Sequence, residues 1–481
     1  MLASLSVFLD FNLPNATTWF YFSFLLAIAL FFKFGRLLSI RNGDVVALFA
    51  LVPGFLLIQG ARPSAGPVME HPAIYASAII GQSATPGMPL PVVTHAGVVV
   101  QQAAPAFMAG RWLWIGYLWL MCGSVYFFAR CIFDLALVQR PALSANLSVG
   151  GLGWLAGALL ICLMAVAFRS HERPGAPPPP TPPPVTAPAS NAAPGEGATM
   201  FLVQNVLAPP AWAFQLLAVL CHVAIVVGLV VIGWRHFGDV SAGMAAATFY
   251  LLLPYTGIYV GQAAHAWPAA LLVWAVAAFR FPTLAGTLLG LATGTAFFPL
   301  FLLPAWVGFY VGGRGVGRFL VAWLVALVLC LVNLGGVLYD LDTVPARLAD
   351  SVSALLPWWP PTTEGFWTGV HTAYRLPVFI AYLAFVSATA VWPSPKNLAR
   401  LIALSAATLV GLQLWYGEHG GAYVLWYAPL LLLLAFRPNL QEHRPPPIVA
   451  DTDWLARSWR WLSKSVRRLT RLPEPAQAPR A

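Results

Sequence analysis

The chain has 481 residues, of which 59% are apolar and only 9% are charged, and its mean hydropathy is +0.75. Soluble domains carry about a quarter of charged residues, so this composition excludes an ordinary soluble globular protein. The net charge of +10 would fit a nucleic-acid-binding protein, but the basic residues gather in alternate short loops beside apolar segments. That distribution is the positive-inside pattern of membrane proteins, and no nucleic-acid partner is predicted.

Apolar runs that are long enough to cross about 30 Å of hydrocarbon recur along the whole chain. We therefore predict an all-α polytopic membrane protein with about 13 transmembrane helices (about 11 at the least). The predicted spans lie near residues 17–38, 44–60, 112–133, 148–168, 211–233, 239–259, 265–279, 283–298, 299–312, 319–338, 376–392, 399–416 and 422–436.

The orientation of these spans follows from the basic residues. With the N-terminus outside, Lys33, Arg140, Arg235, Arg314 and Arg437 all fall on the cytoplasmic side, as the positive-inside rule requires. An odd number of spans then leaves the C-terminus in the cytoplasm. We expect an integral protein of the cytoplasmic (inner) membrane of a bacterium.

The stretch from 282 to 312 is too long for one straight span. At 1.5 Å per residue it would extend about 46 Å, well beyond the hydrocarbon core. Pro299 and Pro304 lie within it, and proline interrupts a helix because it lacks a backbone N–H and clashes with the preceding turn. The sequence therefore predicts two helical segments with a break near Pro299.

The spans divide the chain into three parts. Residues 1–43 hold an additional N-terminal span, residues 44–438 form the multi-span membrane domain, and residues 439–481 form a cytoplasmic tail. Three long outer loops are expected at 61–110, 169–208 and 339–375. The second contains PGAPPPPTPPPVTAPAS, which is a polyproline spacer.

The tail contains an amphipathic segment. In DTDWLARSWRWLSKSVRRLTRL, apolar residues recur at helical spacing and six Arg or Lys residues fill most of the remaining positions. This pattern predicts a basic helix over 453–472 that lies on the anionic cytoplasmic leaflet. A helix that docks on another protein is the alternative.

Few charged residues lie inside the predicted spans. Arg130 and Asp134 are one helical turn apart near the cytoplasmic end of their span, so a structural ion pair is the favoured interpretation. His222 is isolated within its span and is expected to hydrogen-bond a neighbouring helix.

The other ionisable residues gather on the outer side. Arginine forks grip phosphate, and a carboxylate beside them can serve as a general base, so this outer set suits the anionic headgroup of a lipid. Asp340 and Asp342 in the sequence DLD are candidate oxygen ligands for a divalent cation. Two carboxylates at this spacing are common by chance, so a divalent cation is kept only as an alternative, and no other cofactor is predicted.

Three segments resemble a known family. They are LAPPAWAFQLLAVLCHVAIVVGLVVIGWRHFG, YVGQAAHAWPAALLVWAVAAF and PTLAGTLLGLATGTAFFPLFLLPAW, all between Leu207 and Trp306. They are similar to C-type glycosyltransferases of family 87, which show a Gly-Gln-x-Asn start and a later GLAAALKxYPxLLLLP segment. The late segment GEHGGAYVLWYAPLLLLLAF resembles that family's last His/Tyr segment, with His419 and Tyr423 in those places.

The resemblance implies transfer of a sugar, as a hexosyltransferase such as a mannosyltransferase would perform it, from a polyprenyl-phosphate lipid to an acceptor outside the membrane. A carboxylate would act as general base and the reaction would invert the anomeric carbon. Glu70 is the only acid of the first outer loop and is the first candidate, with Asp340 and Asp342 as alternatives. The candidates for binding the donor and its phosphate are Arg62, Arg111, Gln262, His265, Arg375, His419 and Tyr423.

The chain departs from the family pattern at two positions. Ala264 stands where the family has Asn, and Ala296 stands where it has Lys. These departures keep a second hypothesis open, a catalytically inactive relative that acts as a lipid-binding or scaffold protein of the cell envelope.

Overall fold

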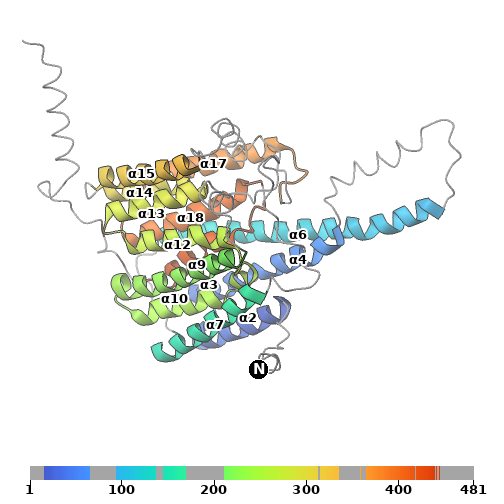
Figure 1. Ribbon diagram of the computed structural model, residues 1–481, viewed down its shortest axis with the longest axis horizontal. Helices are drawn as coiled ribbons and strands as arrows, with labels where there is room; N and C mark the ends of the chain where they lie inside the picture. The colour runs from blue at the N-terminus through green and yellow to red at the C-terminus, as the bar shows by residue number, and fades with distance from the viewer. Residues whose placement is uncertain are drawn as a thin grey trace, which may run out of the picture.

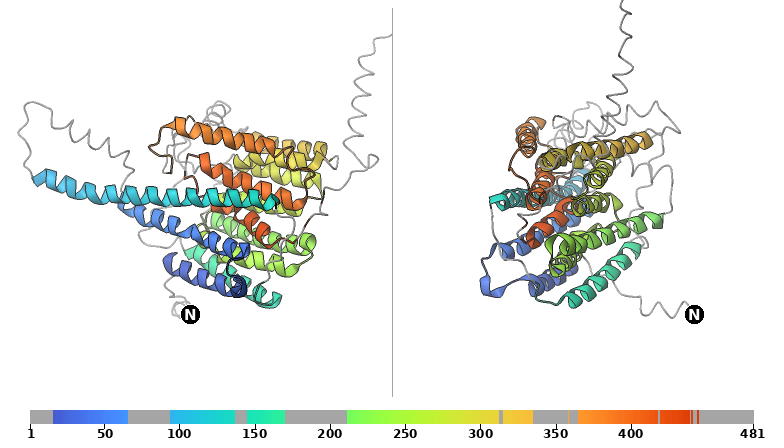
Figure 2. Two further views of the ribbon diagram at one scale, coloured as in Figure 1. Left: turned by 180° about the vertical axis from the view of Figure 1, so that it is seen from behind. Right: turned by 90° about the vertical axis from the view of Figure 1, so that its left-hand side faces the viewer.

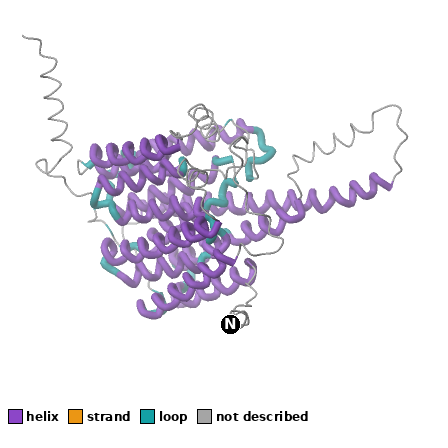
Figure 3. The backbone as a smooth tube through the Cα atoms, viewed as in Figure 1, coloured by secondary structure: helices purple, strands orange, loops and turns teal. Residues whose placement is uncertain are grey.

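The regular structure of the described residues is helical. The computed structural model describes residues 16–65, 94–136, 145–169, 211–311, 315–334, 358, 365–417, 419–438, 440 and 444, and these contain helices and no strands (Figure 3). The α-helices are α2 (Ala16–Phe31), α3 (Ile40–Ala50), α4 (Val52–Ala65), α6 (Thr94–Ala136), α7 (Val149–Arg169), α9 (Ala211–Ile232), α10 (Val240–Leu252), α11 (Pro254–Ile258), α12 (Ala263–Ala277), α13 (Pro282–Thr295), α14 (Leu303–Val311), α15 (Val316–Leu334), α17 (Arg375–Ala388), α18 (Leu398–Trp415) and α19 (Val424–Phe436). The all-α prediction is confirmed for this part of the chain.

Five of these stretches are long and apolar enough to cross a membrane. They are Ile40–Ile58, Gly110–Ala136, Val149–Phe168, Gln215–Phe237 and Leu398–Trp415, found by length and composition within the described residues. The other apolar helices are shorter. The protein is therefore a helical membrane protein in its composition and its elements, and the larger number of crossings remains a prediction.

The helices lie side by side in a bundle. They run from α2 and α7 at one edge to α15 and α17 at the opposite edge (Figure 1), and a view from the side shows the same stacking (Figure 2). Helix α19 is buried along its whole length, and α18 is buried except at Arg400 and Leu414. Helix α19 is apolar on every side, and a helix of that kind belongs in the interior. The described part of α7 is mostly exposed, which fits its place at the edge.

Both ends of the segment predicted as the first outer loop, 61–110, are helical. Helix α4 continues to Ala65 and α6 begins at Thr94, while the long apolar stretches on either side run over Ile40–Ile58 and Gly110–Ala136, so the boundaries of the loop remain a prediction. The N-terminal half of α6 projects beyond the rest of the bundle (Figure 1). Residues such as Gln101, Ala103 and Met108 favour helix, which allows the span to continue outward. Glu70 lies outside the described residues.

The other predicted boundaries have mixed outcomes. The loop expected at 339–375 ends where the short 3-10 helix Thr372–Tyr374 leads into α17. The proline-rich spacer and the amphipathic tail 453–472 lie outside the described residues. The break predicted between 282 and 312 is confirmed, because α13 ends at Thr295 and a 3-10 turn at Phe298–Leu302 precedes α14.

A row of glycines brings α13 against α15. Gly286, Gly290 and Gly294 are spaced four residues apart and face that helix. A Cβ on Gly290 would lie 2.4 Å from the backbone oxygen of Trp323, and one on Gly294 would lie 2.3 Å from Cβ of Cys330. Small residues at this spacing allow the backbones of membrane helices to approach closely, and no larger side chain fits here without moving α15.

Candidate functional site: a histidine–aromatic cluster and a buried ion network

Two groups of residues lie at opposite ends of α19, and both contact α6. The first, which we call the histidine–aromatic cluster, consists of Tyr117, Tyr259, His265, His419, Tyr423 and Trp426. The second, the ion network, consists of Arg41, Asp44, Arg130, Asp134 and Arg437. Tyr117 and Arg130 are thirteen positions apart in α6, which corresponds to about 20 Å along a helix.

The turn between α18 and α19 positions His419. His419 has a positive φ of 48° and Gly421 has a φ of 90°, both in the left-handed region that glycine adopts without strain. The buried Gln413 side chain accepts hydrogen bonds from the backbone N–H groups of Gly421 (3.0 Å) and Tyr423 (3.4 Å). These bonds hold the turn, and Tyr117 of α6 bonds Nδ1 of His419 at 2.7 Å.

The ring of His265 lies within a stack of aromatic rings. Its centroid is 4.3 Å from that of Tyr259 and 5.6 Å from that of Tyr423, with interplanar angles of 19° and 20°. The stack continues through Trp426, 4.1 Å from Tyr423, to Phe298 at 3.8 Å. Nδ1 of His265 is buried without a hydrogen-bond partner among the described residues. The stack therefore holds the imidazole of His265 between aromatic rings and leaves its Nδ1 without a hydrogen bond to the described residues.

Arg375 is packed beside the same turn. It is 1% exposed, and its Nε donates to the backbone oxygen of Trp415 at 3.2 Å. A Cβ on Gly417 would lie 2.8 Å from Nη2 of Arg375, so the guanidinium rests on that glycine, two positions from His419. The guanidinium joins the start of α17 to the turn that carries His419.

Tyr117 is the side chain through which α6 reaches the cluster. Tyr117→Phe removes the bond to His419, and we expect a loss of about 1 kcal/mol in the free energy of unfolding, the usual contribution of one buried hydrogen bond. Unfolding in mixed detergent micelles measures this change. Tyr126→Phe on the exposed side of the same helix is the matched control, and an equal loss in both variants would contradict the assignment.

The structure brings together part of the predicted donor-binding set. His265, His419 and Tyr423 lie in one cluster with Arg375 beside it, whereas Gln262 and Arg111 are exposed. Arg62 is the fourth residue from the C-terminal end of α4. The candidate carboxylates Glu70, Asp340 and Asp342 lie outside the described residues. Their placement near the cluster therefore remains a prediction.

Sequence reasoning missed the aromatic members Tyr117, Tyr259 and Trp426. Each lies in or beside an apolar helix, where a single aromatic residue cannot be told from ordinary core. The signal that was available is the high content of aromatic residues, 13% of the chain, which does not say which rings meet.

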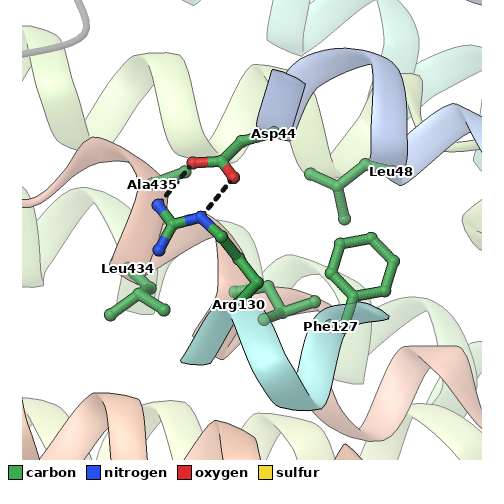
Figure 4. A pocket seen from close by; sticks show the side chains of 7 residues that line it. Asp44, Leu48, Phe127, Arg130, Leu434 and Ala435 are labelled. Carbon is green, nitrogen blue, oxygen red and sulfur yellow. Dashed lines mark hydrogen bonds and ion pairs between the residues drawn. The ribbon is translucent and has the colours of Figure 1, made fainter. Parts of the chain in front are cut away.

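The ion network joins three helices. Arg130 of α6 grips Asp44 of α3 with two bonds, from Nε to Oδ1 (2.7 Å) and from Nη2 to Oδ2 (2.8 Å), as Figure 4 shows. Its Nη1 donates to Asp134 at 3.2 Å, and Nη2 of Arg437, after α19, donates to the other oxygen of Asp134 at 2.6 Å. All four side chains are buried.

The predicted pair of Arg130 and Asp134 is confirmed, and the structure adds Asp44 and Arg437 as long-range partners. A small pocket beside the network is lined mostly by apolar side chains, among them Leu48 and Phe127 (Figure 4). The expectation for His222 is also confirmed, because its Nδ1 bonds the Tyr250 hydroxyl of α10 at 2.8 Å.

Neither group resembles a metal site. Among the residues that the structure describes, no three His, Cys, Asp or Glu side chains are placed to hold a metal ion. Comparison of the chain with protein-family models, with curated proteins and with solved structures gives no match.

Proposed function

We propose that the protein is an integral membrane glycosyltransferase that moves a sugar from a polyprenyl-phosphate donor to an acceptor outside the membrane. The observation that carries the proposal is the convergence of His265, His419 and Tyr423, with Arg375 beside them, although they come from separate parts of the sequence. Histidine and arginine stabilise a departing phosphate, and aromatic rings offer apolar faces on which a sugar ring packs.

The proposed orientation places this cluster on the outer side. Five basic residues lie at or next to the ends of helices, on the side predicted to be cytoplasmic: Lys33, Arg235, Arg280, Lys396 and Arg437. A cytoplasmic position for these residues follows the positive-inside rule. We retain about 13 spans, an outer N-terminus, a cytoplasmic C-terminus and the inner membrane of a bacterium as parts of the proposal.

In the proposed reaction, a carboxylate removes the proton from the acceptor hydroxyl, whose oxygen attacks the anomeric carbon of the donor. The bond between that carbon and the phosphate oxygen breaks, the polyprenyl phosphate leaves with its electron pair, and the configuration inverts. Glu70 is the first candidate for the base, and Asp340 and Asp342 are the alternatives. His419 and Arg375 are proposed to stabilise the leaving phosphate.

A non-catalytic lipid-binding or scaffold role is the second candidate. It is favoured by the stacking of His265 between Tyr259 and Tyr423, which covers both faces of the imidazole. It is also favoured by the bond from Arg375 to a backbone oxygen, because a guanidinium used in this way supports the fold. In this role the tail at 453–472 would hold the protein on anionic lipids of the cytoplasmic leaflet.

The test uses the purified protein in liposomes with a panel of polyprenyl-phosphate hexoses, and it measures release of polyprenyl phosphate. We expect turnover by the wild type and a loss of about 100-fold in Glu70→Gln, as for removal of a general base. We also expect a loss of about 100-fold in His419→Gln, as for removal of one group that stabilises the developing charge. Arg235→Met, an exposed residue at the other end of the bundle, is the control and is expected to keep wild-type activity.

The outcomes separate the two candidates. Donor binding by the wild type without release of polyprenyl phosphate, under any acceptor supplied, would establish the non-catalytic role. Turnover that is equal in wild type, Glu70→Gln and His419→Gln would exclude the proposed residues while retaining the transferase activity.

A further inference from the structure

Arg41 in the ion network has an unused hydrogen-bonding edge. It is 8% exposed, and its Nη1 donates to the backbone oxygen of Ala435 at 3.1 Å. Its Nε and Nη2 are buried and have no partner among the described residues. These two nitrogens lie on the same edge of the guanidinium, and Arg130 uses that edge to grip both oxygens of Asp44.

The charges around Arg41 favour an anion at this edge. Among the side chains of the ion network, three guanidinium groups face two carboxylates, and both carboxylates are bound by Arg130 or Arg437. Asp44 and, more weakly, Asp134 attract Arg41, whereas Arg130 and Arg437 repel it; neither carboxylate hydrogen-bonds Arg41, and the five groups together carry one excess positive charge. Nε of Arg437 is a further buried donor without a partner in the described part of the chain. A buried guanidinium with unmet donors and excess positive charge is costly unless an anion completes it.

From this arrangement we propose that Arg41, with Arg437 beside it, binds a phosphate group at the end of the bundle where α3 begins and α6 and α19 end. The two N–H groups on one edge of a guanidinium match two oxygens of a phosphate. The group belongs to an anionic phospholipid or to free phosphate. This site is separate from the histidine–aromatic cluster and does not depend on the proposed glycosyltransferase activity.

The experiment measures anion binding to the full-length protein in a nonionic detergent. Inorganic phosphate is titrated and followed by the shift in melting temperature, and phosphatidylglycerol is added at defined ratios and counted by native mass spectrometry. Saturation by both ligands supports a site for the phosphate group itself. Saturation by phosphatidylglycerol alone supports a lipid headgroup site, and saturation by phosphate alone supports a site for the free ion.

Two variants of Arg41 and one control make the result specific. We expect Arg41→Met to weaken binding about tenfold or more and Arg41→Lys to weaken it by a smaller factor, because lysine keeps the charge but loses the two-pronged edge. Arg235→Met removes an exposed cation and is expected to bind as the wild type does. Arg41→Lys serves as the test if the methionine variant fails to fold.

The proposal is overturned if neither ligand saturates the wild type. It is also overturned if folded Arg41→Lys and Arg41→Met both bind with wild-type affinity, because binding would then occur elsewhere. An equal loss in Arg235→Met would show attraction to the overall positive charge of this end and would likewise exclude a site at Arg41.

Discussion

Arg130→Met is expected to destabilise the protein by about 3–5 kcal/mol, the usual cost of breaking a buried ion pair by removing one partner. Arg130 holds both oxygens of Asp44 and one of Asp134, and all three side chains are almost completely buried. Methionine preserves much of the volume but leaves the Asp44 carboxylate uncompensated in an apolar surrounding. The free energy of unfolding in mixed detergent micelles measures the loss.

The double variant Asp44→Leu/Arg130→Met tests the cause of this loss. It removes the charge that Arg130→Met leaves behind, so we expect it to recover a large part of the stability, and a double-mutant cycle gives the coupling. Arg235→Met, at an exposed arginine, is expected to change stability by less than about 0.5 kcal/mol. A double variant that is less stable than Arg130→Met would contradict the interpretation of a compensated ion pair.

Gly290→Leu is expected to cost about 3 kcal/mol, at the upper end of the range for overpacking. A Cβ at this position lies 2.4 Å from the backbone oxygen of Trp323 and 2.8 Å from Cβ of Ala326. Because the nearest atom belongs to the backbone, a side-chain rotation cannot relieve the clash, and α15 must move away from α13. The loss of melting temperature in detergent is the measurement.

Gly157→Leu is the matched control for Gly290→Leu. It makes the same change in α7, at an exposed glycine with nothing within 4 Å of a Cβ. Leucine also favours helix over glycine, so we expect equal or slightly higher stability. A similar loss in both variants would show that leucine itself is harmful in these helices and would exclude the close approach of α13 and α15 as the cause.

Much of the fold was predictable from the sequence because hydropathy and segment length are local properties. Each predicted span corresponds to a helix or to a pair of broken helices in the structure. The break near Pro299 was predictable for the same reason, since proline acts on its own turn. The helical conformation of residues 94–109 was not predictable in this way, because they have no charge pattern that distinguishes a projecting helix from a surface segment.

The chemistry was predictable only where it is local. Arg130 and Asp134 are four residues apart, so helical geometry alone places them together. Asp44 is 86 residues from Arg130, and Arg437 is 303 residues from Asp134, and nothing in their local sequence marks them as partners. The same holds for Tyr117 and His419, which are 302 residues apart.

The sequence by itself therefore determined that this protein is helical, largely apolar and broken near Pro299. Only the tertiary structure decided that Arg41, Asp44, Arg130, Asp134 and Arg437 form one network, and that His265 and His419 lie in one aromatic cluster. The physical reason is that the apolar composition of a span specifies that its side chains are removed from water, but not which other helices they pack against. Which helices meet depends on the fit of surfaces such as the glycine row of α13, and that fit is a property of pairs of helices.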